Sequence, residues 1–157
     1  MNSLIGKSIG QTKPFDNVFH KVLVSLKYTA SRIANWQTNF FEPYGITPQQ
    51  FNILRILRGA KGKPLSVSDL KARMIDENSD VSRLIDRLLR LELVERQVGA
   101  SDRRFAQVTI SPQGLELLAD IDPRMSEMYH TLFQNVTEEQ AEQVNIFLNK
   151  IIEDTKS

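Results

Sequence analysis

Three arginines recur at helical spacing in the middle of the chain. Arg83, Arg87 and Arg90 are separated by four and three residues, and Ser82 adjoins the first of them. The planar guanidinium fork matches the oxygens of a phosphate group and the O6 and N7 acceptors of guanine. These residue types on one helix face indicate binding to a nucleic acid. The alternative is a solvated face with ion pairs, which is the more common origin of a charge run.

The residues between these arginines complete an amphipathic helix. Their spacing of i, i+3, i+4, i+7 and i+8 predicts a helix over roughly 79–91 with one buried face. The apolar positions are Val81, Leu84, Ile85, Leu88 and Leu89. The opposite face therefore carries the arginines into solvent.

Two shorter helices are expected before the arginine-bearing one. Thr47 followed by Pro48 combines a hydroxyl N-cap with a proline at the first helical position. The helix that starts there is interrupted by residues 59–64, which run from a glycine to a proline. Ser66 begins a third helix, and the polar residues 76–79 form a turn before the fourth. These elements place a helix-turn-helix ahead of the arginines.

A hairpin with a basic tip is expected after the arginine-bearing helix. Residues 93–97 and 105–110 show the alternation and β-branched content of strands. The loop between them ends in Asp102, Arg103 and Arg104. Three helices followed by such a hairpin are the order of a winged helix-turn-helix, in which the last helix enters the DNA major groove and the hairpin reaches an adjacent groove.

Amphipathic helices flank this segment on both sides. Residues 16–41 carry apolar side chains every three or four positions without glycine or proline, and such a long helix needs a partner for its apolar face. Ser111 restarts a helix that Pro123 is expected to kink or break, and a capping box at Thr137 starts the last one. Residues 1–14 have no periodic apolar face and are expected to form a flexible arm or a short cap.

The amino-acid composition and the absence of known motifs argue against several classes of protein and site. The 157 residues include no cysteine, which excludes disulfides, cysteine-based zinc sites and iron–sulfur clusters. No apolar stretch has the length of a membrane span, and no signal peptide is apparent, so we expect a cytoplasmic protein. His20 and His130 lie far apart without further ligands, so we expect no metal site. No catalytic motif is present, and we expect no enzyme activity and no cofactor.

The near-zero net charge conceals a polarised chain. The formal charge is +1, but residues 1–110 hold 17 Lys and Arg against 10 Asp and Glu, whereas residues 111–157 hold 3 against 9. The first segment therefore has a formal net charge of +7, and the second has a formal net charge of −6. A basic segment that contains the predicted helix-turn-helix and hairpin favours a polyanionic partner.

Several of these segments together resemble the MarR family of bacterial transcription regulators. The resemblance covers roughly residues 16–155, and its most specific element is the Asp-Arg-Arg tip followed by Ser-Pro-Gln-Gly. The segments that carry it are residues 47–51, 82–88, 93–96, 101–104 and 109–114. It departs from the usual pattern after the fourth helix, where Leu91-Glu92 replaces a Lys-Gly that would cap the helix end.

The resemblance implies a mainly α fold with a small β-hairpin, with the winged helix-turn-helix in residues 45–110. It implies a homodimer formed through helices in residues 15–44 and 111–157, bound to a pseudo-palindromic operator in double-stranded DNA. Family members are commonly repressors released by small aromatic or phenolic ligands. The residues that match the family's DNA contacts are Ser79, Ser82, Arg83, Arg87, Asp102, Arg103 and Arg104.

Five aromatic residues near the junction of the first long helix and the helix-turn-helix are candidates for the ligand pocket. They are His20, Trp36, Phe40, Tyr44 and Phe51. Aromatic residues at helical spacing are more often plain core. A second reading of the whole chain is a winged-helix module that binds a ligand or a protein and does not read DNA, because fold alone does not fix function. The basic helix face and the Arg103-Arg104 tip favour the DNA-binding reading.

Overall fold

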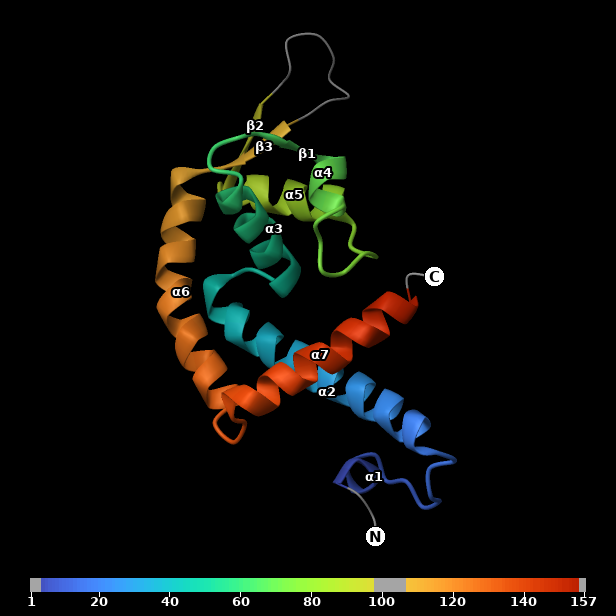
Figure 1. Cartoon of the computed structure of the whole chain (residues 1–157). Helices are drawn as coiled ribbons and strands as arrows, with labels where there is room; N and C mark the ends of the chain where they lie inside the picture. Colours follow the sequence, from blue (N-terminus) through green and yellow to red (C-terminus); the bar gives the residue numbers. More distant parts are fainter. Residues whose placement is uncertain (1–3, 98–106, 156–157) are drawn as a thin grey trace. The chain divides into compact units, whose positions relative to one another are not determined.

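A computed structural model describes residues 4–97 and 107–155 (Figure 1). The chain divides into two compact units, residues Met1–Ser111 and Pro112–Ser157. The first unit contains most of the helices and the sheet, and the second contains two long helices. None of the described helices combines the length and the hydropathy that a bilayer span requires.

The first unit begins with a short helix and a long one. Helix α1 spans Leu4–Ser8, so the segment expected to form an arm contains one turn of helix. Helix α2 spans Val18–Phe41 and starts at the N-cap Asn17, whose side chain accepts a hydrogen bond from the backbone N–H of His20 at 2.9 Å. Phe41 is the single buried residue of α2, and the 3-10 helix η1, Glu42–Tyr44, follows it directly.

Capping residues begin the two helices that follow. Helix α3 spans Pro48–Gly59 with the predicted N-cap Thr47, and Gln50 completes a capping box with it. Helix α4 spans Val67–Lys71, where Ser66 and Asp69 form a second capping box. The hydrogen bonds that Ser66 donates to the Asp69 carboxylate hold the pKa of that group below its ordinary value. The sequence thus encodes both helix starts locally.

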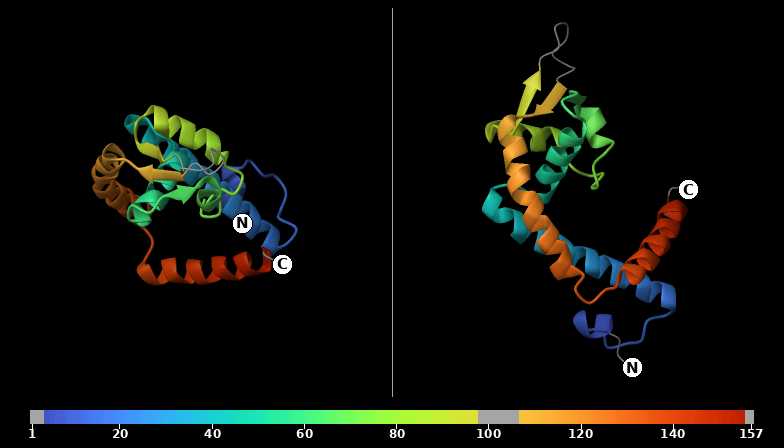
Figure 2. Two further views of the ribbon diagram at one scale, coloured as in Figure 1. Left: turned by 90° about the horizontal axis from the view of Figure 1, so that it is seen from above. Right: turned by 60° about the vertical axis from the view of Figure 1, so that its left-hand side comes forward.

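Helix α5, Val81–Arg90, carries the three arginines. Its N-cap is Asp80, whose carboxylate accepts from the backbone N–H of Arg83 at 3.2 Å. The helix begins two residues later than the sequence pattern predicted, because Ser79 lies before the cap. Helix α5 packs against both α3 and α4, and this completes the helix-turn-helix (Figure 2).

The sheet contains the predicted hairpin and one additional strand. Strands β2, Val94–Gln97, and β3, Gln107–Ile110, pair antiparallel with Val94 opposite Ile110. Strand β1, Leu65–Ser66, pairs with the other edge of β3, giving the order β1-β3-β2. Sequence alternation could not indicate a strand of two residues. The first two residues of the predicted second strand lie outside the described part of the chain.

The core of this unit is formed by side chains from the three helices and the central strand of the winged helix. They are fully buried, with exposed fractions of at most 1%, and they come from α3, α4, α5 and β3: Ile53, Leu54, Leu57, Leu70, Ile85, Leu88 and Val108. Burying an aliphatic side chain of this size contributes about 1.5–3 kcal/mol. The core therefore fixes α5 from its apolar side and leaves the arginine side outward.

Helix α5 ends in a Schellman motif that uses glutamate where glycine is usual. The N–H of Leu93 donates to the carbonyl of Leu88, and the N–H of Glu92 donates to that of Leu89, both at 3.0 Å. Glu92 takes a left-handed φ of 59° to make this possible. Its own carbonyl accepts a hydrogen bond of 2.7 Å from the Ser111 hydroxyl. The helix end is therefore stabilised from outside the helix.

The second unit consists of two helices. Helix α6 spans Pro112–Leu132 without interruption, so a break at Pro123 is wrong, whereas a kink there, the other expected outcome, stays a prediction. The proline removes one backbone donor, but Ile121 and Met125 on either side of it are buried, and packing holds the helix together. Helix α7, Glu138–Thr155, starts at the predicted Thr137 cap, where the side chain of Gln140 completes the capping box. No residue of α7 is buried.

We predict that Asp80→Ala destabilises the protein by about 1 kcal/mol, because the change leaves the N–H of Arg83 without its cap. Urea denaturation followed by circular dichroism measures the effect. Asp80→Asn supplies the control, since its side-chain oxygen can still accept the same hydrogen bond. A loss of equal size in both variants would mean that the cap is not the origin of the effect.

Glu92→Gly is expected to stabilise the protein by about 0.5–1 kcal/mol. The left-handed backbone costs a non-glycine residue roughly 1–2 kcal/mol, and glycine removes that cost while adding roughly 0.5–1 kcal/mol of chain entropy. Leu91→Gly is the control, because Leu91 has an ordinary φ of −87° and gains no such relief. The same urea titration should show stabilisation in the first variant and destabilisation in the second.

Candidate nucleic-acid interface

The arginine face, which we define as Arg83, Arg87 and Arg90, is solvent-exposed along α5. Arg83 stands near the start of the helix, and 81% of its side chain is exposed. Its guanidinium lies 3.9 Å from the carboxylate of Asp80, a loose and exposed ion pair that is worth little in water. The side chain is therefore available to an external partner. Ser82, the neighbouring residue, is also exposed.

Ser79 differs from the other predicted contact residues. It precedes the cap of α5, and its hydroxyl oxygen is buried without a hydrogen-bond partner in the described part of the chain. The apolar spacing placed the start of the helix at about Ser79. Asp80 is the N-cap instead, and the Ser79 hydroxyl is withdrawn from the surface.

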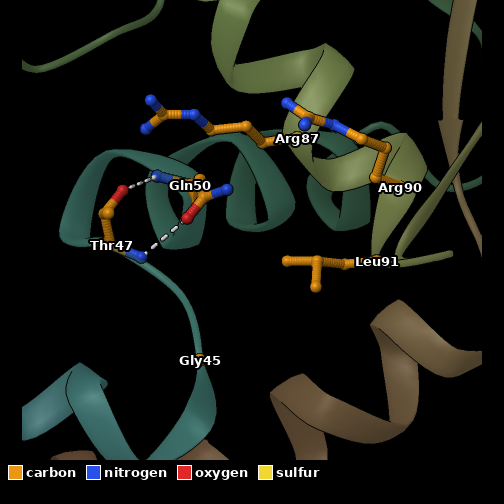
Figure 3. Close-up of a pocket in the computed structure, with 6 residues that line it drawn as sticks. All are labelled: Gly45, Thr47, Gln50, Arg87, Arg90 and Leu91. Atoms are coloured by element: carbon orange, nitrogen blue, oxygen red, sulfur yellow. Dashed lines mark hydrogen bonds between the residues drawn. The ribbon is translucent and has the colours of Figure 1, made fainter.

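Arg87 and Arg90 lie at the other end of the arginine face, beside the start of α3. They line a pocket of about 380 Å³ together with Gly45, Thr47, Gln50 and Leu91 (Figure 3). Arg90 is oriented by a hydrogen bond of 3.2 Å from its Nε to the carbonyl of Asp86. The structure thus separates Arg83, which faces solvent, from two arginines that border a concavity.

An ion pair connects α5 to the hairpin. The Nη2 of Arg96, on strand β2, lies 3.3 Å from the Oδ1 of Asp86 on α5. Both side chains are about half exposed, so the pair contributes well under 1 kcal/mol to stability. Its effect is geometric, since it ties the polar side of the helix to the strand that leads to the hairpin tip. The tip residues Asp102, Arg103 and Arg104 lie outside the described residues.

Three of the five predicted pocket aromatics belong to one cluster. The Phe40 ring lies 5.9 Å from Tyr44 and 5.0 Å from Phe41, and Phe41 lies 4.6 Å from Phe51. The cluster thus joins α2, η1 and α3 through Phe41, a residue that the sequence reasoning did not single out. The hydroxyl of Tyr44 is buried and has no hydrogen-bond partner among the described residues.

His20 does not join this cluster. It lies near the start of α2, where its Nδ1 is 3.2 Å from Asp16 and its ring makes an edge contact with Phe15 at 5.6 Å. Twenty residues of helix separate it from Phe40, which is roughly 30 Å at 1.5 Å per residue. Trp36 precedes Phe40 by one turn and is partly exposed.

Comparison with known sequences gives a consistent result. A model described as the MarR family matches residues 44–104, the segment from η1 into the hairpin. The chain is 28% identical over 129 residues to the uncharacterized HTH-type transcriptional regulator YsmB of Bacillus subtilis, covering 82% of this chain and 86% of that protein. It is 27% identical to the multiple antibiotic resistance protein MarR of Salmonella typhimurium, covering 73% and 78%.

Solved structures share the fold. A complex of MepR from S. aureus with DNA superposes with a TM-score of 0.71 at 23% identity, covering 84% of this chain and 94% of that one. The organohalide-sensing regulator RdhR in its 2,4-dichlorophenol-bound form gives a TM-score of 0.80 at 16% identity, covering 92% and 87%. These relatives are regulators and not enzymes. The family match over the winged helix, the relatives and the shared fold make the chain similar to the MarR family of transcriptional regulators.

Proposed function

We propose that this protein binds a specific operator in double-stranded DNA through α5. The observation that carries the proposal is Arg83, an arginine 81% exposed, on a helix whose opposite face is locked in the core. Such a helix can enter a major groove without rearranging its packing. MepR, which has the same fold, has been solved in a complex with DNA, and this supports DNA as the partner.

Two kinds of contact follow from the exposed residues. Arg83 and Ser82 are suited to read base edges, since arginine binds guanine in a bidentate manner and serine accepts or donates to several bases. Arg87 and the predicted tip residues Asp102, Arg103 and Arg104 would supply and brace contacts to phosphates. Affinity for DNA should therefore fall steeply as the salt concentration rises.

The functional molecule is proposed to be a homodimer. Large apolar side chains are exposed along α2, along α7 and where α6 meets α7, with exposed fractions from 37% to 80%: Val18, Phe19, Leu23, Tyr129, Leu132, Phe133, Val136, Val144, Ile146, Phe147 and Ile152. An amphipathic helix without a buried residue, such as α7, requires a partner for its apolar side. A second copy of the chain supplies that partner and presents two α5 helices to a pseudo-palindromic site.

We further propose that the protein is a repressor released by a small aromatic or phenolic ligand. The cluster of Phe40, Tyr44 and Phe51 offers aromatic surface, and the unpaired Tyr44 hydroxyl offers a hydrogen bond to a phenol. RdhR, a structural neighbour, has been solved with a chlorophenol bound. The ligand would act by favouring a conformation in which the two α5 helices no longer match the operator.

Arg83→Ala is expected to weaken binding to the operator by about 1–3 kcal/mol and to relax sequence preference. The operator is first selected from genomic fragments with the wild-type protein, and fluorescence anisotropy then gives the affinity. Arg73→Ala is the matched control, because this exposed arginine lies beyond the end of α4 and outside α5. Equal affinity of wild-type protein and Arg83→Ala would refute the assignment and favour a winged-helix module that does not read DNA.

Phe147→Asp is expected to shift the protein from dimer to monomer at micromolar concentration, because it places a charge in the apolar face of α7. Sedimentation equilibrium measures the mass. Glu153→Gln on the same helix changes one exposed polar side chain and should leave the dimer intact. A wild-type mass equal to that of one chain would contradict the proposed dimer.

A further inference from the structure

Helix α5 and its flanking residues are not the source of the positive charge of the first unit. Residues 76–92, which contain α5, hold three Lys and Arg against five Asp and Glu, a formal net charge of −2. Residues 55–71, which precede them, hold five against one, a formal net charge of +4. The summed field of a basic segment attracts a polyanion before any contact forms. The segment before α5 therefore needs a role of its own.

Two of these charges stand on a tight turn after α3, residues 61–63, which we call the lysine turn. All three of its residues are exposed. The backbone is held by hydrogen bonds from the N–H of Lys61 to the carbonyl of Arg58 at 3.1 Å and from the N–H of Lys63 to the carbonyl of Ala60 at 3.0 Å. Neither lysine side chain forms an ion pair or hydrogen bond with another residue of the described ranges. The turn therefore presents two cations on a fixed backbone.

The single acidic residue of the segment is engaged elsewhere. Asp69 accepts hydrogen bonds from the N–H and the hydroxyl of Ser66 in the capping box of α4. The hydrogen bond from the Ser66 side chain is the main cause that lowers the pKa of Asp69, and the charges of Arg73 and then Lys63 contribute less. The carboxylate thus belongs to the helix start and leaves the lysine turn largely without a counter-charge.

Lys61 occupies a backbone position that glycine normally fills. Its φ is 51°, in the left-handed region, at the end of α3. This conformation costs free energy for any residue with a Cβ atom, and an exposed lysine has no buried contact to offset the cost. A strained residue that packing does not explain is a candidate for a functional role.

The backbone adds a third donor between the two lysines. The N–H of Gly62 has no hydrogen-bond partner among the described residues. The space beside it is open, because a Cβ atom at Gly62 would meet no atom within 4 Å beyond the adjoining residues. Backbone N–H groups and lysine ammonium groups are common donors to DNA phosphates. The lysine turn therefore has both the donors and the space that a phosphate needs.

The position of the lysine turn relates it to α5 and to the hairpin. The turn leads into β1, which pairs with β3, and in Figure 1 it is the green connection between α3 and β1, beside the sheet. Helix α4 contacts both β1 and α5, so it separates α5 from the strand that the turn enters. A helix with its side chains is about 10–12 Å across, and the major groove is about 12 Å wide. With α5 in the groove, the turn reaches the phosphates at the rim and not the base edges.

We propose that the lysine turn binds phosphates at the rim of the groove that α5 enters, through the ammonium groups of Lys61 and Lys63 and the N–H of Gly62. This inference rests on the proposed function, in which α5 lies in a major groove. Contacts to phosphates carry no sequence information. The turn therefore supplies affinity for any duplex, while Arg83 supplies the preference for one sequence.

The salt dependence of DNA binding tests the lysine turn. The double variant Lys61→Gln, Lys63→Gln keeps side chains of similar length and removes both charges. Each neutralised phosphate contributes about 0.9 to the slope of log affinity against log salt, so four lysines in a dimer predict a slope smaller by about 2–4. Affinity at low salt should fall roughly tenfold or more. Fluorescence anisotropy with operator DNA over a range of KCl concentrations measures both, and a slope and affinity equal to those of the wild type would overturn the proposal.

Two further double variants are matched controls. Lys61→Arg with Lys63→Arg retains both charges and should keep the wild-type slope. Lys7→Gln with Lys13→Gln removes the same total charge before the start of α2 and should also bind like wild type. A slope reduced equally in the Lys7 and Lys13 variant would mean that net charge alone is responsible, which would overturn the assignment. Urea denaturation checks that every variant folds.

Lys61→Gly separates stability from binding. Glycine relieves the left-handed backbone and should raise the urea midpoint, while the loss of one cation should weaken DNA binding. Opposite changes in the two measurements support a lysine that is retained for its charge. A variant that binds DNA as tightly as wild type would overturn the role of Lys61.

Mixed-sequence DNA distinguishes this inference from the proposed function. The glutamine double variant should lose the same factor of affinity on mixed-sequence DNA as on the operator, whereas Arg83→Ala should lose affinity mainly on the operator. A loss confined to the operator would overturn the phosphate assignment. If the wild type preferred no sequence but bound DNA through the lysine turn, the proposed function would fail and the turn would stand. Operator binding that depends on Arg83 and not on the turn would overturn only the present inference.

Discussion

The winged helix depends on the way in which α5 ends. At Leu91–Leu93 the chain leaves the helix and turns into β2, and this reversal requires a left-handed residue, which here is Glu92. Two hydrogen bonds to the last turn of the helix fix the turn, and Ser111 holds it from the far end of the hairpin through the Glu92 carbonyl and the Leu93 carbonyl. The start of β2, the end of β3 and the end of α5 are thus joined at one point.

Because the end of α5 is fixed in this way, the arginine face of the helix can remain exposed to solvent. Val81, Ile85 and Leu88 are fully buried or nearly so, and the helix end is held by backbone hydrogen bonds, so α5 is anchored without a buried residue of the arginine face. Among the described residues, the polar side makes exposed contacts, such as the ion pair between Asp86 and Arg96. Stability and recognition therefore use opposite sides of the same ten residues.

Much of this arrangement could be predicted from local sequence signals. Thr47, Ser66 and Thr137 all cap helices as expected, because the side chain and the donor it satisfies lie within three residues. The predictions that failed concern features that depend on residues far apart in the sequence or on packing in the folded chain. Apolar spacing set the start of the fourth helix at about residue 79, but the helix begins at Val81 after the N-cap Asp80. Pro123 stays within α6 because the buried residues beside it outweigh the missing donor. The pocket was not foreseen, since Gln50 and Arg90 meet only in the folded chain.

The sheet order has a consequence for solubility. Because β1 takes one side of β3, strand β2 is left at the edge of the described sheet, with one row of backbone groups free to pair with another chain. Three of its four residues, Glu95, Arg96 and Gln97, are exposed and polar, and two of them are charged. A short edge with charged side chains is a poor template for intermolecular β-pairing. The exposed edge of β2 therefore does not favour lateral aggregation.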